Sequence, residues 1–240
     1  MSVIEWKKDG TVAVVTMCNG ANRQNLDFAK TMNSLFDDIL ADESIFSLVI
    51  TSSDEKNFSQ GVDIEWMVGK IGEKDFDSIK AFMYGMNSVF KRLLTMPIPV
   101  IAGINGHAFG NGAMLACACD FRFMKRDRGF FCFPEVDINI PFLPGMIAFV
   151  RKAIPEYKFN ELKLTGRRIG ADELERHHII EKSSADLSEL YADVMAFARI
   201  FQKKRGIFGE HKRRLHKSII AVMEQEDPEF IDSLKLFVEG

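Results

Sequence analysis

Strand-type and helix-type segments alternate over the first part of the chain, and this alternation limits the possible folds more than any other feature. β-Branched and apolar runs at 46–53, 100–104 and 121–126 are separated by amphipathic helical patterns, among them 25–42 and 75–96. Strands that alternate with helices are typical of a parallel sheet packed between helical layers. From Gly145 onward we expect helices only, over 145–153, 156–165, 171–177, 188–204, 209–225 and 228–237.

The remaining local patterns complete an α/β prediction. The segment 3–17 alternates around Asp9-Gly10 and predicts a β-hairpin. With 240 residues and no linker or repeat, the chain is long enough for one hydrophobic core. We therefore expect a single domain, with a core over 1–190 and a helical C-terminal region over 191–240.

Composition and charge exclude several classes of protein. A net charge of −3 and a pI near 6.0 argue against a nucleic-acid-binding domain. No apolar run is long enough for a membrane helix, and the N-terminus becomes polar by residue 7, so we expect neither membrane insertion nor a signal peptide. The four cysteines form no C-x-x-C pair and have no further ligands nearby, which predicts free thiols, no metal site and a cytoplasmic location.

Two glycine-containing turns have the character of a binding site. In "NFSQGVDIEWM", residues 57–67, a buried strand runs into a turn at Gly61, and a helical segment follows. In "INGHAFGNG", residues 104–112, three glycines precede an apolar helix. Helix N-termini carry unpaired N–H groups and a positive dipole end, so two such turns brought together can hold an oxyanion.

Glu135 is the candidate proton acceptor. It lies in "FFCFPEVDINIPF", residues 130–142, among phenylalanines and other apolar residues. An apolar environment raises the pKa of a carboxyl group and makes it a competent base near neutral pH. A glutamate at a strand end that faces solvent, or one that a backbone N–H satisfies, remains an equal alternative at this point. In a strand, Asp137 would face the same side as Glu135.

The order of these features resembles the crotonase superfamily, also called the enoyl-CoA hydratase/isomerase family. "FSQGVDI" is similar to the family pattern F-S-x-G-x-D-[LI], and "PIPVIAGINGHAFGNG" to its K-P-[VT]-[IV]-A-A-[IV]-N-G-x-A-x-G-G-G segment. "CDFRF" and "FPEVDINIPFLPG" match two further family segments in the same order. The resemblance covers nearly the whole chain and implies a crotonase-like ββα spiral core.

The resemblance also implies roles for individual residues. Val62 N–H and Asn111 N–H would hold the thioester oxygen of an acyl-CoA, although Asn111 replaces the glycine that is usual there. Glu135 matches the glutamate after the proline, whereas Met114 stands where hydratases of the family carry a second glutamate. A single carboxylate suits a proton shift between carbons, so the pattern favours Δ3,Δ2-enoyl-CoA isomerase, an activity of fatty acid metabolism.

Other functions are compatible with the same sequence pattern. The chain is alternatively another crotonase-type enzyme, such as a hydratase, hydrolase or decarboxylase, or an acyl-CoA-binding member without catalysis. By resemblance, coenzyme A is part of the substrate, no separate cofactor is implied, and assembly as a homotrimer or a dimer of trimers is expected. The alkyl pocket would be lined by the long helix over 75–96 and by apolar residues near Met114, Phe142 and Trp66. The expected contacts to coenzyme A are Arg23, Ser59, Gln60, Gly61, Val62, Asp63 and Asn111.

Overall fold

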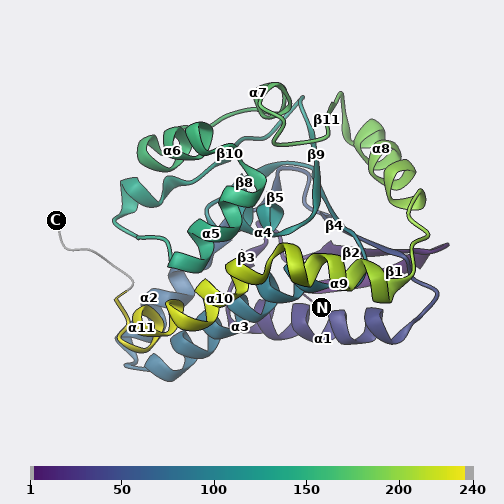
Figure 1. Ribbon diagram of the computed structural model, residues 1–240. Coiled ribbons are helices and arrows are strands. Elements are labelled where there is room, and N and C mark those ends of the chain that lie inside the picture. The colour runs from purple at the N-terminus through teal and green to yellow at the C-terminus, as the bar shows by residue number, and fades with distance from the viewer. Residues whose placement is uncertain (1–2, 236–240) are drawn as a thin grey trace.

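Successive strand–strand–helix units build the α/β fold that the sequence predicts (Figure 1). The computed structural model describes residues 3–235. In each unit one strand enters a large sheet, the next enters a small sheet, and a helix follows, which is the expected ββα spiral. The units are β2 (Val12–Met17), β3 (Arg23–Gln24) and α1 (Leu26–Ala41); β4 (Ser47–Ser52), β5 (Asn57–Ser59) and α3 (Phe76–Thr95); β7 (Val100–Ile104), β8 (His107–Phe109) and α4 (Asn111–Ala118); and β9 (Phe121–Lys125), β10 (Phe131–Cys132) and α5 (Pro144–Ala153).

The large sheet has the strand order β1-β2-β4-β7-β9-β11, where β11 is Lys182–Ser184, and only its first pair is antiparallel. That pair, β1 (Ile4–Asp9) with β2, is the expected hairpin. Two smaller parallel sheets join β10-β8-β5 and β3-β6, where β6 is Gly61–Val62. Helix α2 (Ile64–Gly72) follows β6 directly.

Helices cover both faces of the inner part of the large sheet, which explains why its inner strands β2, β4 and β7 are mostly apolar. In β2, Val12 and Val14 pack toward α8 (Leu187–Arg199), whereas Ala13 and Val15 belong to the main core with α1 and α3. This alternation follows from the two-residue period of a strand. The boundary between the proposed 1–190 and 191–240 regions lies within α8, and the division stays a prediction.

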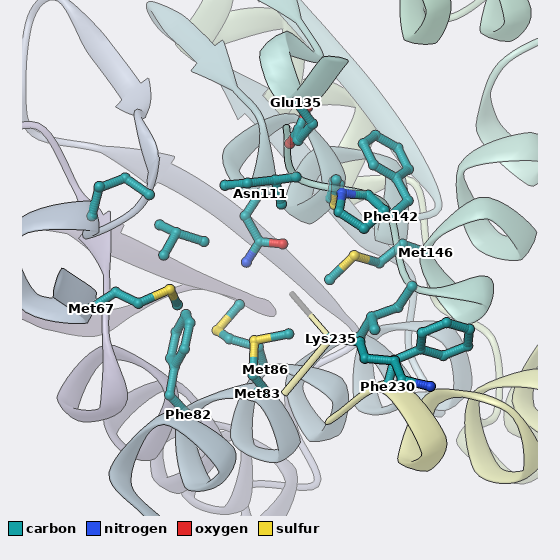
Figure 2. Close-up of a pocket in the computed structure, with 16 residues that line it drawn as sticks. Met67, Phe82, Met83, Met86, Asn111, Glu135, Phe142, Met146, Phe230 and Lys235 are labelled. Atoms are coloured by element: carbon teal, nitrogen blue, oxygen red, sulfur yellow. The ribbon is translucent and has the colours of Figure 1, made fainter. Parts of the chain in front are cut away.

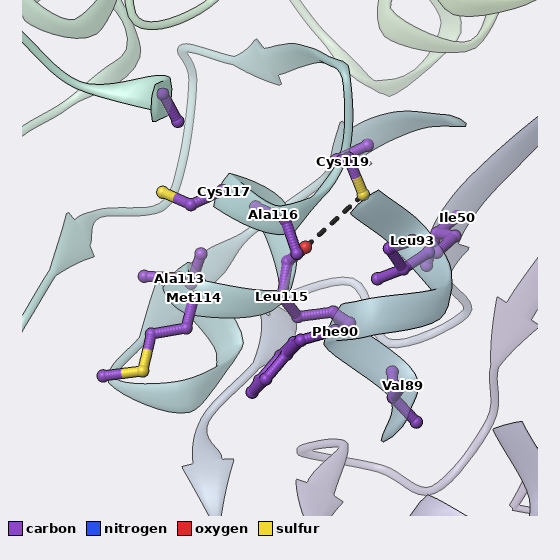
Figure 3. Packing of buried hydrophobic residues seen from close by; sticks show 14 of the residues in the cluster. Ile50, Val89, Phe90, Leu93, Ala113, Met114, Leu115, Ala116, Cys117 and Cys119 are labelled. Atoms are coloured by element: carbon purple, nitrogen blue, oxygen red, sulfur yellow. Dashed lines mark hydrogen bonds between the residues drawn. The ribbon is translucent and has the colours of Figure 1, made fainter. Parts of the chain in front are cut away.

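Helix α4 is buried along its whole length and forms the centre of the molecule. Figure 3 shows its side chains enclosed by Val89, Phe90 and Leu93 of α3 and by Ile50 of β4. At the C-terminal end of the helix, the Cys119 thiol donates a hydrogen bond to the Leu115 carbonyl oxygen at 3.4 Å. Because no face of α4 meets solvent, the direction of its N-terminus is set by packing on every side.

The C-terminal part differs from the sequence prediction in several places. A short strand, β11 (Lys182–Ser184), pairs with β9 where only helices were expected; that prediction was wrong because the polar sequence of β11 carries no strand pattern. The helix expected over 209–225 is divided at His216 into α9 (Arg205–Leu215) and α10 (Lys217–Gln225), and α8 ends at Arg199, before the expected 204.

Helices α6 (Glu156–Thr165) and α7 (Ala171–Arg176) follow the predicted positions. The last helix, α11 (Asp227–Asp232), is shorter than the predicted 228–237, because the chain leaves the helix at Ser233 and Leu234 has φ +53°. Residues 236–237 of that prediction lie outside the described range. Within residues 3–235, no helix is both long and apolar enough to cross a bilayer.

Candidate active site

The two glycine turns singled out in the sequence lie against each other. Gly61 has φ +81°, a conformation that side chains disfavour, and a Cβ built on it would lie 2.7 Å from the Phe109 carbonyl oxygen and 3.1 Å from the Asn111 nitrogen. The turn between β6 and α2 therefore packs directly on the N-terminus of α4. Only glycine allows this approach.

Each turn carries one backbone N–H group that does not pair within its own strand pair or helix. Asp63 N–H donates to the Gln24 carbonyl oxygen at 2.9 Å in the β3–β6 pair. Because successive N–H groups of a strand point to opposite sides, Val62 N–H points away from β3. Asn111 is the first residue of α4, where N–H groups have no partner within the helix, and Gly110 at φ +52° precedes it.

Glu135 lies beside the start of α4. It belongs to a 3₁₀ helix, η1 (Pro134–Ile138), that Pro134 begins, and a Cβ on Gly110 would lie 2.8 Å from Glu135 Oε1. The residue is 8% exposed, and no group within residues 3–235 hydrogen-bonds Glu135 Oε2. Desolvation raises the pKa of Glu135 to about 7, against the lowering effects of a backbone hydrogen bond and of the Lys163 charge. A carboxyl group in this state can exchange protons near neutral pH.

The 3₁₀ helix corrects the placement of Asp137. In a strand Asp137 and Glu135 would share a face, but in η1 Glu135 is buried and Asp137 is exposed. The strand interpretation was wrong because Pro134 starts a helical turn, which separates residues two positions apart.

Val62, Asn111 and Glu135 line one pocket, which is otherwise mostly apolar (Figure 2). Methionines and phenylalanines from α2, α3, α5 and α11 make up much of its wall, and Figure 2 shows the Asn111 carboxamide directed among them. Such a pocket, apolar with a few polar groups, is typical of a site for an acyl chain. Its lining within the described residues is Val62, Ile64, Met67, Phe82, Met83, Met86, Asn111, Met114, Glu135, Ile140, Pro141, Phe142, Leu143, Met146, Phe230 and Lys235.

Some of the residues expected near the alkyl pocket line it in the structure, and others do not. Met114 and Phe142 line the pocket, so a thioether lies where the family resemblance places a second glutamate. Trp66 does not line the pocket, but its neighbours Ile64 and Met67 do. The Trp66 ring packs edge-on against Phe82, with ring centroids 5.5 Å apart. Lys163 Nζ lies 3.8 Å from the centre of the Phe142 ring, on a helix that the sequence did not connect with the site.

The residues expected to contact coenzyme A occupy different environments. Arg23 is exposed and forms an ion pair with Glu65 at 3.3 Å, whereas Ser59 is fully buried and its hydroxyl donates to the Asn22 carbonyl oxygen at 2.7 Å. Asp63 caps α2 by accepting from Trp66 N–H at 3.2 Å, and Gln60 is half-buried beside Asn57. These contacts to coenzyme A stay predictions.

Several residues of the site were missed by sequence reasoning. Gln24 is fully buried and hydrogen-bonds the Asn111 side chain, although nothing in its local sequence marks it. Phe230 and Lys235 reach the pocket from the C-terminal end of the described chain. His107, beside the second glycine turn, accepts a hydrogen bond from Phe130 N–H at 3.2 Å on Nδ1 and does not line the pocket.

Comparison with protein families gives a match over nearly the entire chain. The family model described as enoyl-CoA hydratase/isomerase matches residues 7–232. "Enoyl-CoA delta isomerase 2, peroxisomal" from Arabidopsis thaliana is 30% identical over 201 residues, which cover 82% of each chain. "Short-chain-enoyl-CoA hydratase" from Clostridium acetobutylicum is 32% identical over 180 residues, 73% of this chain and 66% of its own.

Solved structures agree with the sequence matches. A crystal structure titled "enoyl-CoA hydratase/ carnithine racemase" from Magnetospirillum magneticum superimposes with a TM-score of 0.78 at 27% identity. The match covers 90% of this chain and 81% of the other. The relatives thus share one fold and carry several activity names.

Proposed function

The chain belongs to the enoyl-CoA hydratase/isomerase family, and from this premise we propose that it is a Δ3,Δ2-enoyl-CoA isomerase. The observation that carries the proposal is the carboxylate content of the pocket. Among the described residues that line it, Glu135 is the one carboxylate. Met114 also lines the pocket, and by the family resemblance it stands where hydratases carry a second glutamate. Hydration requires activation of water and delivery of a proton to carbon, whereas isomerisation requires one group that moves a single proton.

The proposed reaction is a 1,3 proton shift. Ionised Glu135 removes a proton from C2 of a 3-enoyl-CoA, and the electron pair delocalises onto the thioester oxygen and C4 as a dienolate. Val62 N–H and Asn111 N–H hold the dienolate oxygen, an interaction worth about 10² to 10³ in rate per donor. The carboxyl group of Glu135 then returns the proton at C4 and leaves a 2-enoyl-CoA.

The environment of Glu135 fits this cycle. Burial keeps its pKa at about 7, so the group can accept a proton in one step and release it in the next. The apolar wall excludes water that would otherwise protonate the dienolate. The family resemblance further leads us to propose a homotrimer or dimer of trimers in the cytoplasm, with Arg23, Gln60, Gly61 and Asp63 near the coenzyme A moiety.

The test is a substrate panel. With a 3-enoyl-CoA, the isomerase produces a conjugated thioester whose ultraviolet absorbance rises with time. With a 2-enoyl-CoA in water, a hydratase would instead remove that absorbance. Loss of conjugation without any isomerisation would refute the proposal in favour of hydration, and tight binding of both thioesters without turnover would favour a non-catalytic acyl-CoA-binding protein.

A further inference from the structure

A chain of buried amides and hydroxyls extends from the pocket into the protein. Asn111 Nδ2 donates to Gln24 Oε1 at 2.6 Å, and Gln24 Nε2 donates to Ser59 Oγ at 3.2 Å. Ser59 Oγ in turn donates to the carbonyl oxygen of Asn22 at 2.7 Å. Asn22, Gln24 and Ser59 are all fully buried, and Asn111 is 5% exposed. Buried polar groups persist when each finds a partner, and this chain meets that requirement.

The backbone at the inner end sets the direction of every hydrogen bond in the chain. The Asn22 carbonyl oxygen can only accept, so it takes the single proton of the Ser59 hydroxyl. Ser59 Oγ must then accept from Gln24 Nε2, as it also does from Gly61 N–H at 3.2 Å. Gln24 Oε1 therefore faces Asn111 and requires the Nδ2 group as its donor. The Asn111 amide has one orientation, with Oδ1 as the remaining polar atom.

Gln24 contacts both segments that carry the proposed oxyanion donors. Its backbone pairs with β6, where its carbonyl oxygen accepts from Asp63 N–H, next to Val62. Its side chain binds Asn111, the first residue of α4. The segments at 24, 62 and 111 come from three different units of the spiral, and this one residue links them.

We infer that Gln24 is a positioning residue of the oxyanion hole. It sets the separation between Val62 N–H and Asn111 N–H through one backbone and one side-chain contact. This inference rests on the proposed function for its reaction, but it concerns the geometry of the two donors. Because a misplacement of about 1 Å can cost about 10² in rate, a change at Gln24 is expected to act on oxyanion binding more than on substrate affinity.

The probe is acetoacetyl-CoA, whose bound enolate absorbs in the ultraviolet and carries the same thioester oxygen that the dienolate would place in the hole. Gln24→Met keeps the side-chain volume and removes both amide hydrogen bonds. We expect it to weaken binding of the enolate about 10- to 100-fold, while binding of saturated butanoyl-CoA changes less than about threefold. Ser52→Ala is the matched control, since Ser52 Oγ accepts from Asn22 Nδ2 at 2.6 Å at the far end of the same network.

A double-substitution cycle separates pairing from packing. On the Asn111→Gly background the amide partner is absent and the second N–H remains, so adding Gln24→Met is expected to leave enolate binding within about threefold. An equal loss on both backgrounds would overturn the inference, as would an unchanged enolate signal in Gln24→Met. If Gln24→Met alone does not fold, Asn111→Gly is compared with the double variant. A further loss of enolate binding in the double variant contradicts the proposed pairing of Gln24 with Asn111.

The two proposals fail in different ways. If the wild-type protein forms the bound enolate but does not isomerise a 3-enoyl-CoA, the proposed isomerase function is refuted. The role of Gln24 is then supported or overturned by the double-substitution cycle alone. A wild-type protein that binds acetoacetyl-CoA without any enolate signal overturns the role of Gln24, because there is then no oxyanion hole for it to position.

Discussion

Two buried carboxylates, Glu135 and Asp227, show how similar burial produces different roles. Burial raises the pKa of both groups. Asp227 accepts hydrogen bonds from Gly145 N–H at 2.8 Å and from Asn87 Nδ2 at 2.9 Å, and it is fully buried. Glu135 lines the pocket, and its Oε2 has no hydrogen-bond partner within residues 3–235.

The difference lies in the partners that each carboxylate has. Asp227 joins the start of α11 to the start of α5 and to α3, so its hydrogen bonds hold three helices together. Glu135 is held near Gly110 by the turn of η1, and one of its oxygens is left for a proton. A satisfied buried carboxylate contributes structure, whereas an unsatisfied one costs stability and is available for chemistry.

The largest expected effect is on activity at Glu135. Glu135→Gln keeps the shape of the side chain and removes the base, so kcat for isomerisation should fall by about 10³-fold or more. Asp227→Asn is the comparison variant and should retain kcat within a few-fold, because Asp227 does not line the pocket. Steady-state kinetics on a 3-enoyl-CoA measures both. A fully active Glu135→Gln protein would rule out Glu135 as the base.

The next effect is on stability at Asp227. Asp227→Ala leaves Gly145 N–H and the Asn87 amide without their acceptor, which should lower the free energy of unfolding by about 2 to 4 kcal/mol. Asp227→Asn keeps an acceptor for Gly145 N–H and should cost much less. Denaturant unfolding of the two variants is the measurement, and equal losses would show that the hydrogen bonds contribute little.

Substitution of Glu135 is expected to raise the free energy of unfolding, whereas substitution of Asp227 lowers it. Since its pKa rises from 4.5 in the unfolded chain to about 7 in the folded protein, the folded state binds the proton more tightly. Stability is therefore lost as pH rises from 4.5 to 7, and above 7 the ionised group destabilises the fold by about 3 kcal/mol. Glu135→Gln should be more stable than wild type by about this amount at pH 8 and by under about 1 kcal/mol at pH 5. A variant that is less stable at both pH values would contradict the desolvated state of Glu135.

The smallest effect is the pH dependence of the reaction. Glu135 must be ionised to accept the C2 proton, so kcat/KM should rise about tenfold per pH unit below pH 7 and level off above it. Lys163→Met removes a positive charge that lowers the pKa of Glu135, and the midpoint should move to higher pH. A profile with its midpoint near 4.5 in the wild type would place Glu135 in a solvated environment.

Much of the fold follows from local patterns along the chain. The turn at Asp9-Gly10 and the amphipathic period of 25–42 and 75–96 correspond to the observed hairpin and to α1 and α3. Strand β11 and the break at His216 did not follow from local patterns, because both involve contacts with distant segments. Strand β11 forms by pairing with β9. At the helix break, the His216 ring is buried, with Nδ1 2.7 Å from the Leu94 carbonyl oxygen.

The types of group in the site follow from the sequence: two glycine turns that can expose N–H donors, one glutamate after a proline and, by the family resemblance, a methionine in place of a second carboxylate. How these groups meet depends on the tertiary structure. Glu135 is buried because η1 turns it away from Asp137, and Asn111 is oriented because Gln24, 87 residues earlier, lies beside it. Desolvation and hydrogen-bond direction are properties of surroundings that distant segments supply, so neither can be derived from a local pattern.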